Sequence, residues 1–150
     1  MKVVMVTTWD KACGIATYSS NLIKQLRAHG CGVEVFSATE NYAELAKFSK
    51  LVNCDVVHFQ HEFGIMPDTT PFLSIIAKLK SRGIRVVLTA HTEDDPFNIM
   101  IDGAVDAVIL HNDTRGLAGK QTFSQFVKIP HGIPEVSFEE TREFYRKKYG

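Results

Sequence analysis

The sequence predicts a Rossmann-like three-layer α/β/α domain, in which helices cover both faces of a mainly parallel sheet of about six strands. Two observations lead to this fold class. Short segments rich in Val, Ile and Phe recur along the chain, and most are apolar at nearly every position, as strands buried on both faces are. Helical patterns separate these segments, and strand–helix alternation is typical of a parallel sheet with right-handed crossovers. The expected strands are Val3–Thr7, Val33–Ser37, Val56–Phe59, Val86–Thr89, Ala107–Leu110 and Phe126–Ile129.

Helices are expected between these strands. The first has apolar residues at helical spacing and ends near Gly30; these residues are Ile15, Tyr18, Leu22 and Leu26. Thr70 and Pro71 predict an N-cap and a first helical position for a helix that ends before Gly83. Weaker patterns predict helices over residues 41–50 and 114–121.

A last helix is expected to open at Ser137, which starts a Ser-x-x-Glu capping box. We therefore expect one domain over residues 1–136 and the start of a linker helix over residues 137–150. This basic, aromatic helix either contacts a membrane surface or packs on sequence beyond Gly150, and the second interpretation is preferred.

The composition excludes several classes of protein. Seventeen Lys and Arg residues balance 17 Asp and Glu residues, so the basic excess typical of a nucleic-acid-binding protein is absent. No segment reaches the roughly 18 apolar residues of a transmembrane helix, and the N-terminus lacks the features of a signal peptide. Three widely spaced cysteines form neither a disulfide framework nor a Cys-x-x-Cys motif. We expect a cytoplasmic protein with no nucleic-acid partner.

Polar residues follow the predicted strands. Because the carboxyl ends of parallel strands meet at one edge of the sheet, four of the six histidines are expected at that edge. A single histidine is more often a hydrogen-bonded structural residue, whereas their shared placement indicates a polar site. The residues that follow the strands are Gln60, His61, Glu62, His91, His111, Asn112 and His131.

The turn at Cys13 and Gly14 opens the first helix. Its free backbone N–H groups and the helix dipole favour an anion, and Gly14 would let a phosphate approach the backbone. A tight turn that requires a small residue explains Gly14 equally well. Cys13 is better interpreted as a small core residue than as a nucleophile, because a phosphatase loop needs Arg where Ser19 stands. Neither Gly-x-Gly-x-x-Gly nor a P-loop motif occurs.

A metal site is a rival interpretation of the same residues. His61, Glu62, His91, Asp94 and His111 are of the types that bind metals, but no pair has the short spacing of a metal motif on one helix. The preferred expectation is a site without metal or cofactor.

Several segments together resemble glycosyltransferase family 4. Thr8–Tyr18 is similar to the first loop and helix of that family, and Val57–Gly64 to its Gln-His-Glu-aromatic-Gly segment. Val87–Thr92 matches its strand-then-His pattern, Lys128–Ile133 its Ile-Pro-His-Gly segment, and Arg146–Gly150 the helix that leads to a second domain. The resemblance spans nearly the whole chain.

The resemblance implies a GT-B enzyme, with two Rossmann-like domains facing a cleft, that retains configuration as it transfers sugar from a nucleotide-sugar. This chain would be the acceptor-side domain. The donor-binding domain, which carries a Glu-x7-Glu signature, is absent from the sequence, so the isolated chain is expected to be inactive. The implied partners are a sugar or glycolipid acceptor, a nucleotide-sugar held by the second domain and, for the last helix, a peripheral membrane contact.

The resemblance also implies roles for individual residues. Cys13 and Gly14 would bind the donor diphosphate, and His91 would lie against the transferred sugar. The acceptor pocket would be formed by Gln60, His61, Glu62, His111 and Asn112. No metal or cofactor is implied for transfer.

Other functions are compatible with the same architecture. Sugar epimerases and phosphorylases also use two such domains, and product analysis would separate them from a transferase. A non-catalytic sugar- or nucleotide-binding module, or a subunit of a split transferase, is the remaining alternative.

Overall fold

The computed structural model describes residues 1–37, 42–62, 64, 66, 68–92, 101, 103–111, 126–132 and 146–147. The regular elements in these ranges alternate between strand and helix up to β4. They are β1 (Lys2–Thr7), α1 (Gly14–Ala28), β2 (Gly32–Ser37), α2 (Tyr42–Leu51), β3 (Val56–His61), α3 (Thr69–Ser81), β4 (Arg85–Ala90), β5 (Ala107–Leu110) and β6 (Phe126–Lys128).

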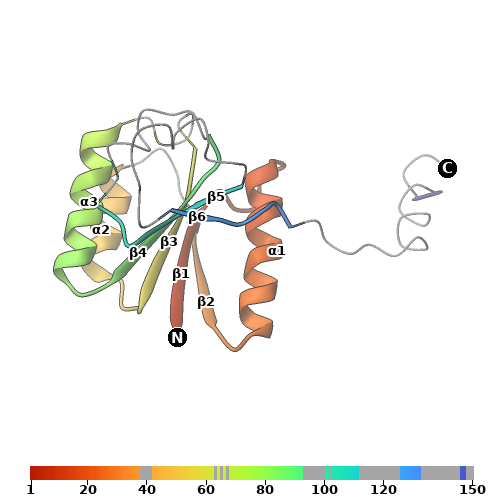
Figure 1. Ribbon diagram of the computed structural model, residues 1–150, viewed down its shortest axis with the longest axis horizontal. Helices are drawn as coiled ribbons and strands as arrows, with labels where there is room; N and C mark the ends of the chain where they lie inside the picture. Colours follow the sequence, from red (N-terminus) through yellow and green to blue (C-terminus); the bar gives the residue numbers. More distant parts are fainter. Residues whose placement is uncertain are drawn as a thin grey trace.

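The strands form one sheet in the order β2-β1-β3-β4-β5-β6, and every neighbouring pair is parallel. Helix α1 covers one face of the sheet, and α2 and α3 cover the other (Figure 1). The chain leaves β1 toward β2 and then crosses back to β3, so the strand order reverses beside β1. Ligands of such folds bind at the carboxyl edge near this reversal. The predicted Rossmann-like three-layer fold is thus confirmed.

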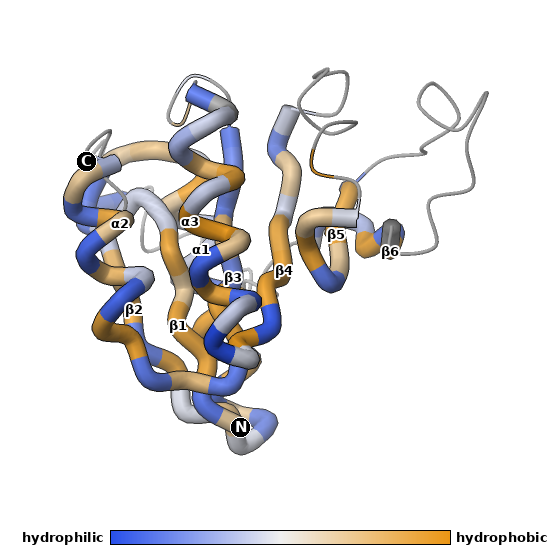
Figure 2. Tube along the Cα trace, turned by 90° about the vertical axis from the view of Figure 1, so that its left-hand side faces the viewer, coloured by the Kyte–Doolittle hydropathy of each residue, from blue (hydrophilic) through white to orange (hydrophobic). Residues whose placement is uncertain are grey.

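Each face of the sheet has its own apolar core, because successive side chains of a strand point to opposite faces. On the α1 side, Met5 packs with Ile23 of the helix. On the other side, Phe59 meets Phe72 of α3 with ring centroids 4.9 Å apart. The hydrophobic colouring follows the central strands in Figure 2. Strands that supply both cores are apolar at most positions, as the sequence indicates.

The predicted elements differ from the structure mainly at their ends. All six strands are present, and β5 has the predicted bounds. The predicted N-cap at Thr70 is wrong: Asp68 is the N-cap of α3, and the helix begins at Thr69. Pro71 therefore occupies the third helical position. It is tolerated there because the first four N–H groups of a helix have no partner within the helix, so the missing N–H costs nothing.

Four sequence predictions lie wholly or mostly outside the described residues. They are Asp94, Asn112, the helix over residues 114–121, and the last helix from Ser137, of which the structure describes only Arg146 and Lys147, both helical and exposed. Across the part of the chain that the structure describes, no helix combines the length and the apolar character needed to cross a membrane.

Candidate functional site

Four aromatic rings gather at the carboxyl edge of the sheet, on the face that α1 covers. The Tyr18 ring of α1 is at their centre, with its centroid 5.3 Å from that of His91, 5.0 Å from His111 and 5.1 Å from His131. The histidines follow β4, β5 and β6, so three adjacent strands deliver one ring each. We call these four residues the ring cluster.

Gln60 fixes the orientation of His91. Its buried side chain lies at the end of β3, where the amide nitrogen faces the Met5 sulfur and Nε2 of His58, 3.2 and 3.3 Å away. The amide oxygen lies 2.9 Å from Nε2 of His91 and accepts a hydrogen bond from it. His91 therefore carries its proton on Nε2, and its Nδ1 keeps a free lone pair.

A second network of hydrogen bonds joins His58 and Thr89 to Tyr18 of the ring cluster. Nε2 of His58 lies 2.8 Å from the Thr89 hydroxyl, which in turn bonds the hydroxyl of Tyr18. Burial lowers the pKa of His58 to about 4, and the nearby His91 adds to that effect. Burial raises the pKa of Tyr18. Both side chains are accordingly neutral at pH 7.

His91 is also held neutral. Burial is the main cause that lowers its pKa to about 4, and His111, His131 and His61 add to it in that order, because nearby imidazoles disfavour a further positive charge. A neutral His91 accepts a hydrogen bond at Nδ1 and does not provide a cation.

His111 is held in the opposite tautomer. Its Nδ1–H donates to the backbone carbonyl of Ile129, 2.9 Å away. Its Nε2 is buried, and no described residue forms a hydrogen bond with it. The residue as a whole is 7% exposed. His111 thus brings a bare lone pair into the ring cluster.

His61 lies on the other side of the sheet, which differs from the expectation of one rim shared by His61, His91 and His111. Alternation along β3 places Gln60 on the α1 face and His61 on the α3 face, where its ring packs 5.4 Å from that of Phe72. His61 is 1% exposed. The structure therefore brings Gln60, His91 and His111 together and leaves His61 in the core.

Glu62 lies beyond the end of β3 and stays partly exposed. Its carboxylate accepts a hydrogen bond of 3.4 Å from the Thr92 hydroxyl, and a Cβ added at Gly64 would lie 2.9 Å from Oε2 of Glu62, so the flexible carboxylate would have to move. Glu62 thus provides a carboxylate beside the segment that carries His91.

The loop after β1 leads into the N-terminus of α1. Cys13 is the N-cap of this helix, and its sulfur accepts from the Ala16 N–H at 3.4 Å. The sequence interpretation of Cys13 as a core residue is wrong, because the thiol is only half-buried and caps a helix. A hydrogen bond from the Thr8 hydroxyl and the Ala16 N–H lower its pKa.

Gly14 is the first residue of α1 and is exposed. A Cβ added to it would meet no atom within 4 Å, so the structure itself does not require glycine at this position. The first turn of α1 contains no acidic residue, which leaves the positive end of the helix dipole uncompensated. Gly14 and Tyr18 are one turn apart on the same side of α1, about 6 Å along its axis.

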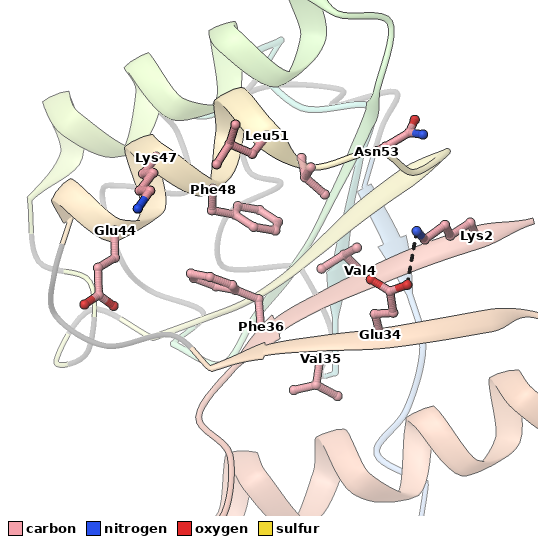
Figure 3. A pocket seen from close by; sticks show the side chains of 11 residues that line it. Lys2, Val4, Glu34, Val35, Phe36, Glu44, Lys47, Phe48, Leu51 and Asn53 are labelled. Carbon is pink, nitrogen blue, oxygen red and sulfur yellow. Dashed lines mark ion pairs between the residues drawn. The ribbon is translucent and has the colours of Figure 1, made fainter.

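A pocket among the described residues lies elsewhere. It has a volume of about 690 Å³ and lies between α2 and the edge strand β2 (Figure 3). Phe36 and Phe48 stack in it with centroids 4.4 Å apart, and Lys2 pairs with Glu34 at 3.1 Å. It contains no histidine and no residue of the ring cluster, so the chemically distinctive site is the carboxyl edge.

Sequence reasoning missed two members of the site, Tyr18 and His58, and left His131 without a role. Tyr18 fits the apolar pattern of α1, and that pattern predicts only packing of the helix against the sheet. His58 lies within an apolar strand, where no turn signal marks it. The placement after the strands already indicated His91, His111 and His131, and their equal spacing of 20 residues is a further signal.

Comparison with known proteins supports this fold. No protein-family model matches the sequence, and no curated protein sequence matches it significantly. MurG of Acinetobacter baumannii is similar in structure, with a TM-score of 0.59 and 13% identity over 90% of this chain and 46% of that protein. An alpha-glucosyltransferase solved with UDP and a mismatched 13-mer DNA has a TM-score of 0.53 and 16% identity over 75% of this chain and 37% of its own.

Both neighbours have the GT-B fold, and at these identities the likeness extends to the fold alone: the described domain has the Rossmann-like α/β architecture of one half of such structures. The chain spans less than half of the length of each neighbour.

Proposed function

We propose that this chain is the acceptor-side half of a retaining glycosyltransferase that moves a sugar from a nucleotide-sugar to a sugar or glycolipid acceptor. The observation that carries the proposal is His91, a neutral histidine at the end of β4 held by Gln60 in a GT-B-type domain. The nucleotide portion of the donor would be bound by a second domain beyond residues 1–136. Residues 137–150 would begin the linker to it.

The N-terminal turn of α1 would bind the donor diphosphate. The helix dipole there favours an anion, and Gly14 leaves space for a phosphate oxygen to approach the backbone. Because Tyr18 lies one turn further along the same side of α1, a sugar attached to that diphosphate would reach the ring cluster.

His91 would contact the transferred sugar. Its free Nδ1 would accept a hydrogen bond from a sugar hydroxyl, while Gln60 holds its other nitrogen. In the transfer step, the bond between the anomeric carbon and the diphosphate oxygen breaks, a bond to the acceptor oxygen forms, and the proton of the acceptor hydroxyl passes to the departing diphosphate. The developing negative charge on the diphosphate would be stabilised by the turn at Gly14.

The acceptor would bind on the other side of the sugar. Glu62 is the best placed acceptor-binding residue among those described, because its carboxylate is partly exposed and makes only a 3.4 Å contact with Thr92. Gln60 and His111 already use side-chain atoms on His91 and Ile129, so they would position the site. Asn112 belongs to the same proposal on sequence grounds.

The experiment is a transfer assay with the protein encoded by the complete reading frame. UDP-, GDP- and ADP-sugars are offered with a panel of sugar and glycolipid acceptors, nucleoside diphosphate release is measured, and NMR identifies the anomer formed. We expect a new glycoside with the anomeric configuration of the donor, and loss of turnover in His91→Ala.

Each alternative gives a different product. An isomerised nucleotide-sugar would identify an epimerase, and a sugar phosphate formed from a glycoside and inorganic phosphate would identify a phosphorylase. Binding of a nucleotide-sugar with none of these products would indicate a non-catalytic module, and any of these results would overturn the transferase proposal.

A further inference from the structure

The three histidines of the ring cluster bring ring nitrogen atoms close together. One ring nitrogen from each of His91, His111 and His131 lies within 4.8 Å of the other two. We propose that these histidines bind one divalent transition-metal cation of the zinc type, through Nδ1 of His91, Nε2 of His111 and one ring nitrogen of His131. The inference rests on the cluster itself, and an ion on Nδ1 of His91 would take the place of the sugar hydroxyl that the transferase proposal assigns to that atom.

The strongest independent observation is Nε2 of His111. A buried nitrogen without a partner loses its hydration and gains no hydrogen bond, which costs about 1–3 kcal/mol in proteins. The His111 ring is enclosed by the rings of Tyr18, His91 and His131, with centroids 3.8 to 5.5 Å away. No described residue donates to this lone pair, and Tyr18 directs its hydroxyl to Thr89 instead. A cation among the rings would supply the missing partner.

The outer contacts of two histidines match those of metal ligands. A metal-binding histidine usually donates its second N–H to a carbonyl or carboxylate, which fixes the tautomer and the ring orientation. His111 donates Nδ1–H to the backbone carbonyl of Ile129, and His91 donates Nε2–H to the amide oxygen of Gln60, both at 2.9 Å. The two rings are thus prepared with one lone pair each.

The dimensions are suited to a tetrahedral ion. With metal–nitrogen bonds of about 2.0–2.1 Å, nitrogens around such an ion are roughly 3.3 Å apart, so no separation would have to close by more than about 1.5 Å. His131 is exposed and follows β6, whereas the rings of His91 and His111 are less exposed. The His131 ring therefore has the most space to adjust.

The donor set also suggests the metal and its chemistry. Three imidazoles suit zinc, copper, nickel or iron better than magnesium or calcium, which prefer oxygen. Three neutral ligands leave the full charge on the ion and a fourth position open to water or to an oxygen of a bound hydroxyl or phosphate.

The test measures metal binding without any activity assay. The protein is titrated with Zn²⁺ against a chromogenic chelator, and with Co²⁺ by visible absorption. We expect one ion per chain, a tetrahedral cobalt spectrum, and a higher melting temperature with Zn²⁺. His131→Ala should weaken binding by more than about 100-fold, because loss of an outer partner alone costs roughly 10–100-fold. His29→Ala, at the exposed end of α1, is the matched control and should bind as the unmodified chain does.

His131 is exposed, so its substitution leaves the core intact and keeps the test decisive even where His111→Ala fails to fold. Equal Zn²⁺ affinity in the unmodified chain and in His131→Ala, or no saturable binding at all, overturns the proposal. A sulfur-to-cobalt charge-transfer band would place the ion on a cysteine and would overturn it as well.

Discussion

The side-chain oxygen of Gln60 lies 2.9 Å from Nε2 of His91, and this contact joins the end of β3 to the residue that follows β4. The same amide approaches Nε2 of His58 through its nitrogen. One uncharged side chain therefore sets the tautomers of two histidines, because its oxygen can only accept and its nitrogen can only donate. The position of the His91 lone pair depends on this residue.

Replacing Gln60 with Leu tests that dependence. The change leaves Nε2–H of His91 without an acceptor and removes the amide donor from His58, so we expect a stability loss of about 1–3 kcal/mol. For a chain of this size, each kcal/mol corresponds to a fall of about 2–4 °C in melting temperature. The measurement is thermal unfolding together with the NMR assignment of the His91 tautomer.

Gln25→Leu is the matched control, because Gln25 is exposed on α1 and no side-chain contact of Gln25 is among the described hydrogen bonds. We expect it to change stability by less than about 0.5 kcal/mol. An unchanged His91 tautomer in Gln60→Leu would show that another group orients the ring.

His58 makes the folded protein sensitive to acid. Its pKa is lowered from 6.5 to about 4 by burial, so the unfolded chain binds a proton in this pH range that the folded protein does not. The free energy of unfolding should therefore be highest above pH 6.5 and fall as the pH drops from 6.5 to 4. A shift of this size corresponds to roughly 3 kcal/mol. Urea unfolding at a series of pH values measures the slope.

His58→Gln should flatten this pH dependence, because an amide oxygen accepts from Thr89 without titrating. Part of the slope should remain, since the pKa of His91 is lowered in the same direction. His29→Gln, at the exposed C-cap of α1, should leave the slope unchanged. Equal slopes in all three proteins would mean that His58 is already protonated or hydrated in the folded state.

Two substitutions of Tyr18 separate the contribution of ring packing to stability from that of hydrogen bonding in the ring cluster. Tyr18→Phe keeps the three ring contacts and removes only the hydroxyl that bonds Thr89, so we expect a loss of about 1 kcal/mol. Tyr18→Ala also removes those contacts, and edge-to-face ring pairs contribute about 0.5–1.5 kcal/mol each beyond the buried area. Denaturant unfolding of both variants measures the difference. Equal losses in the two variants would assign the stabilisation to the hydroxyl alone.

The fold could be predicted from the sequence because it depends on patterns that repeat over many residues. Runs such as Val3–Thr7 are buried at every position and apolar at nearly every one because both faces of β1 are covered, and that pattern survives the replacement of any single residue. Parallel pairing and crossover handedness then follow from general rules.

The site was only partly predictable, because it depends on which way individual side chains point. Gln60 and His61 are adjacent in β3 and were assigned together, yet alternation places them on opposite faces. Tyr18 joins the histidines only because α1 packs over β1 with that side of the helix toward the carboxyl edge. The capping role of Cys13 depends on the dihedral angles of one residue, with φ at −144° and ψ at 156°.

Gly14→Ala decides between the two interpretations of the α1 turn. An added Cβ would meet no atom within 4 Å, and alanine favours helix, so we expect stability unchanged or slightly higher. If the turn binds a diphosphate, the methyl group occupies the approach of the phosphate and weakens UDP or GDP binding by about tenfold, which is 1.4 kcal/mol.

Gly32→Ala is the matched control, because it lies at the opposite edge of the sheet, where its Cβ would make an ordinary 3.9 Å contact with the Met1 carbonyl. Isothermal titration of the full-length protein measures binding of both variants. Unchanged affinity in Gly14→Ala would leave the glycine with no role beyond the turn and would remove the proposed diphosphate site from α1.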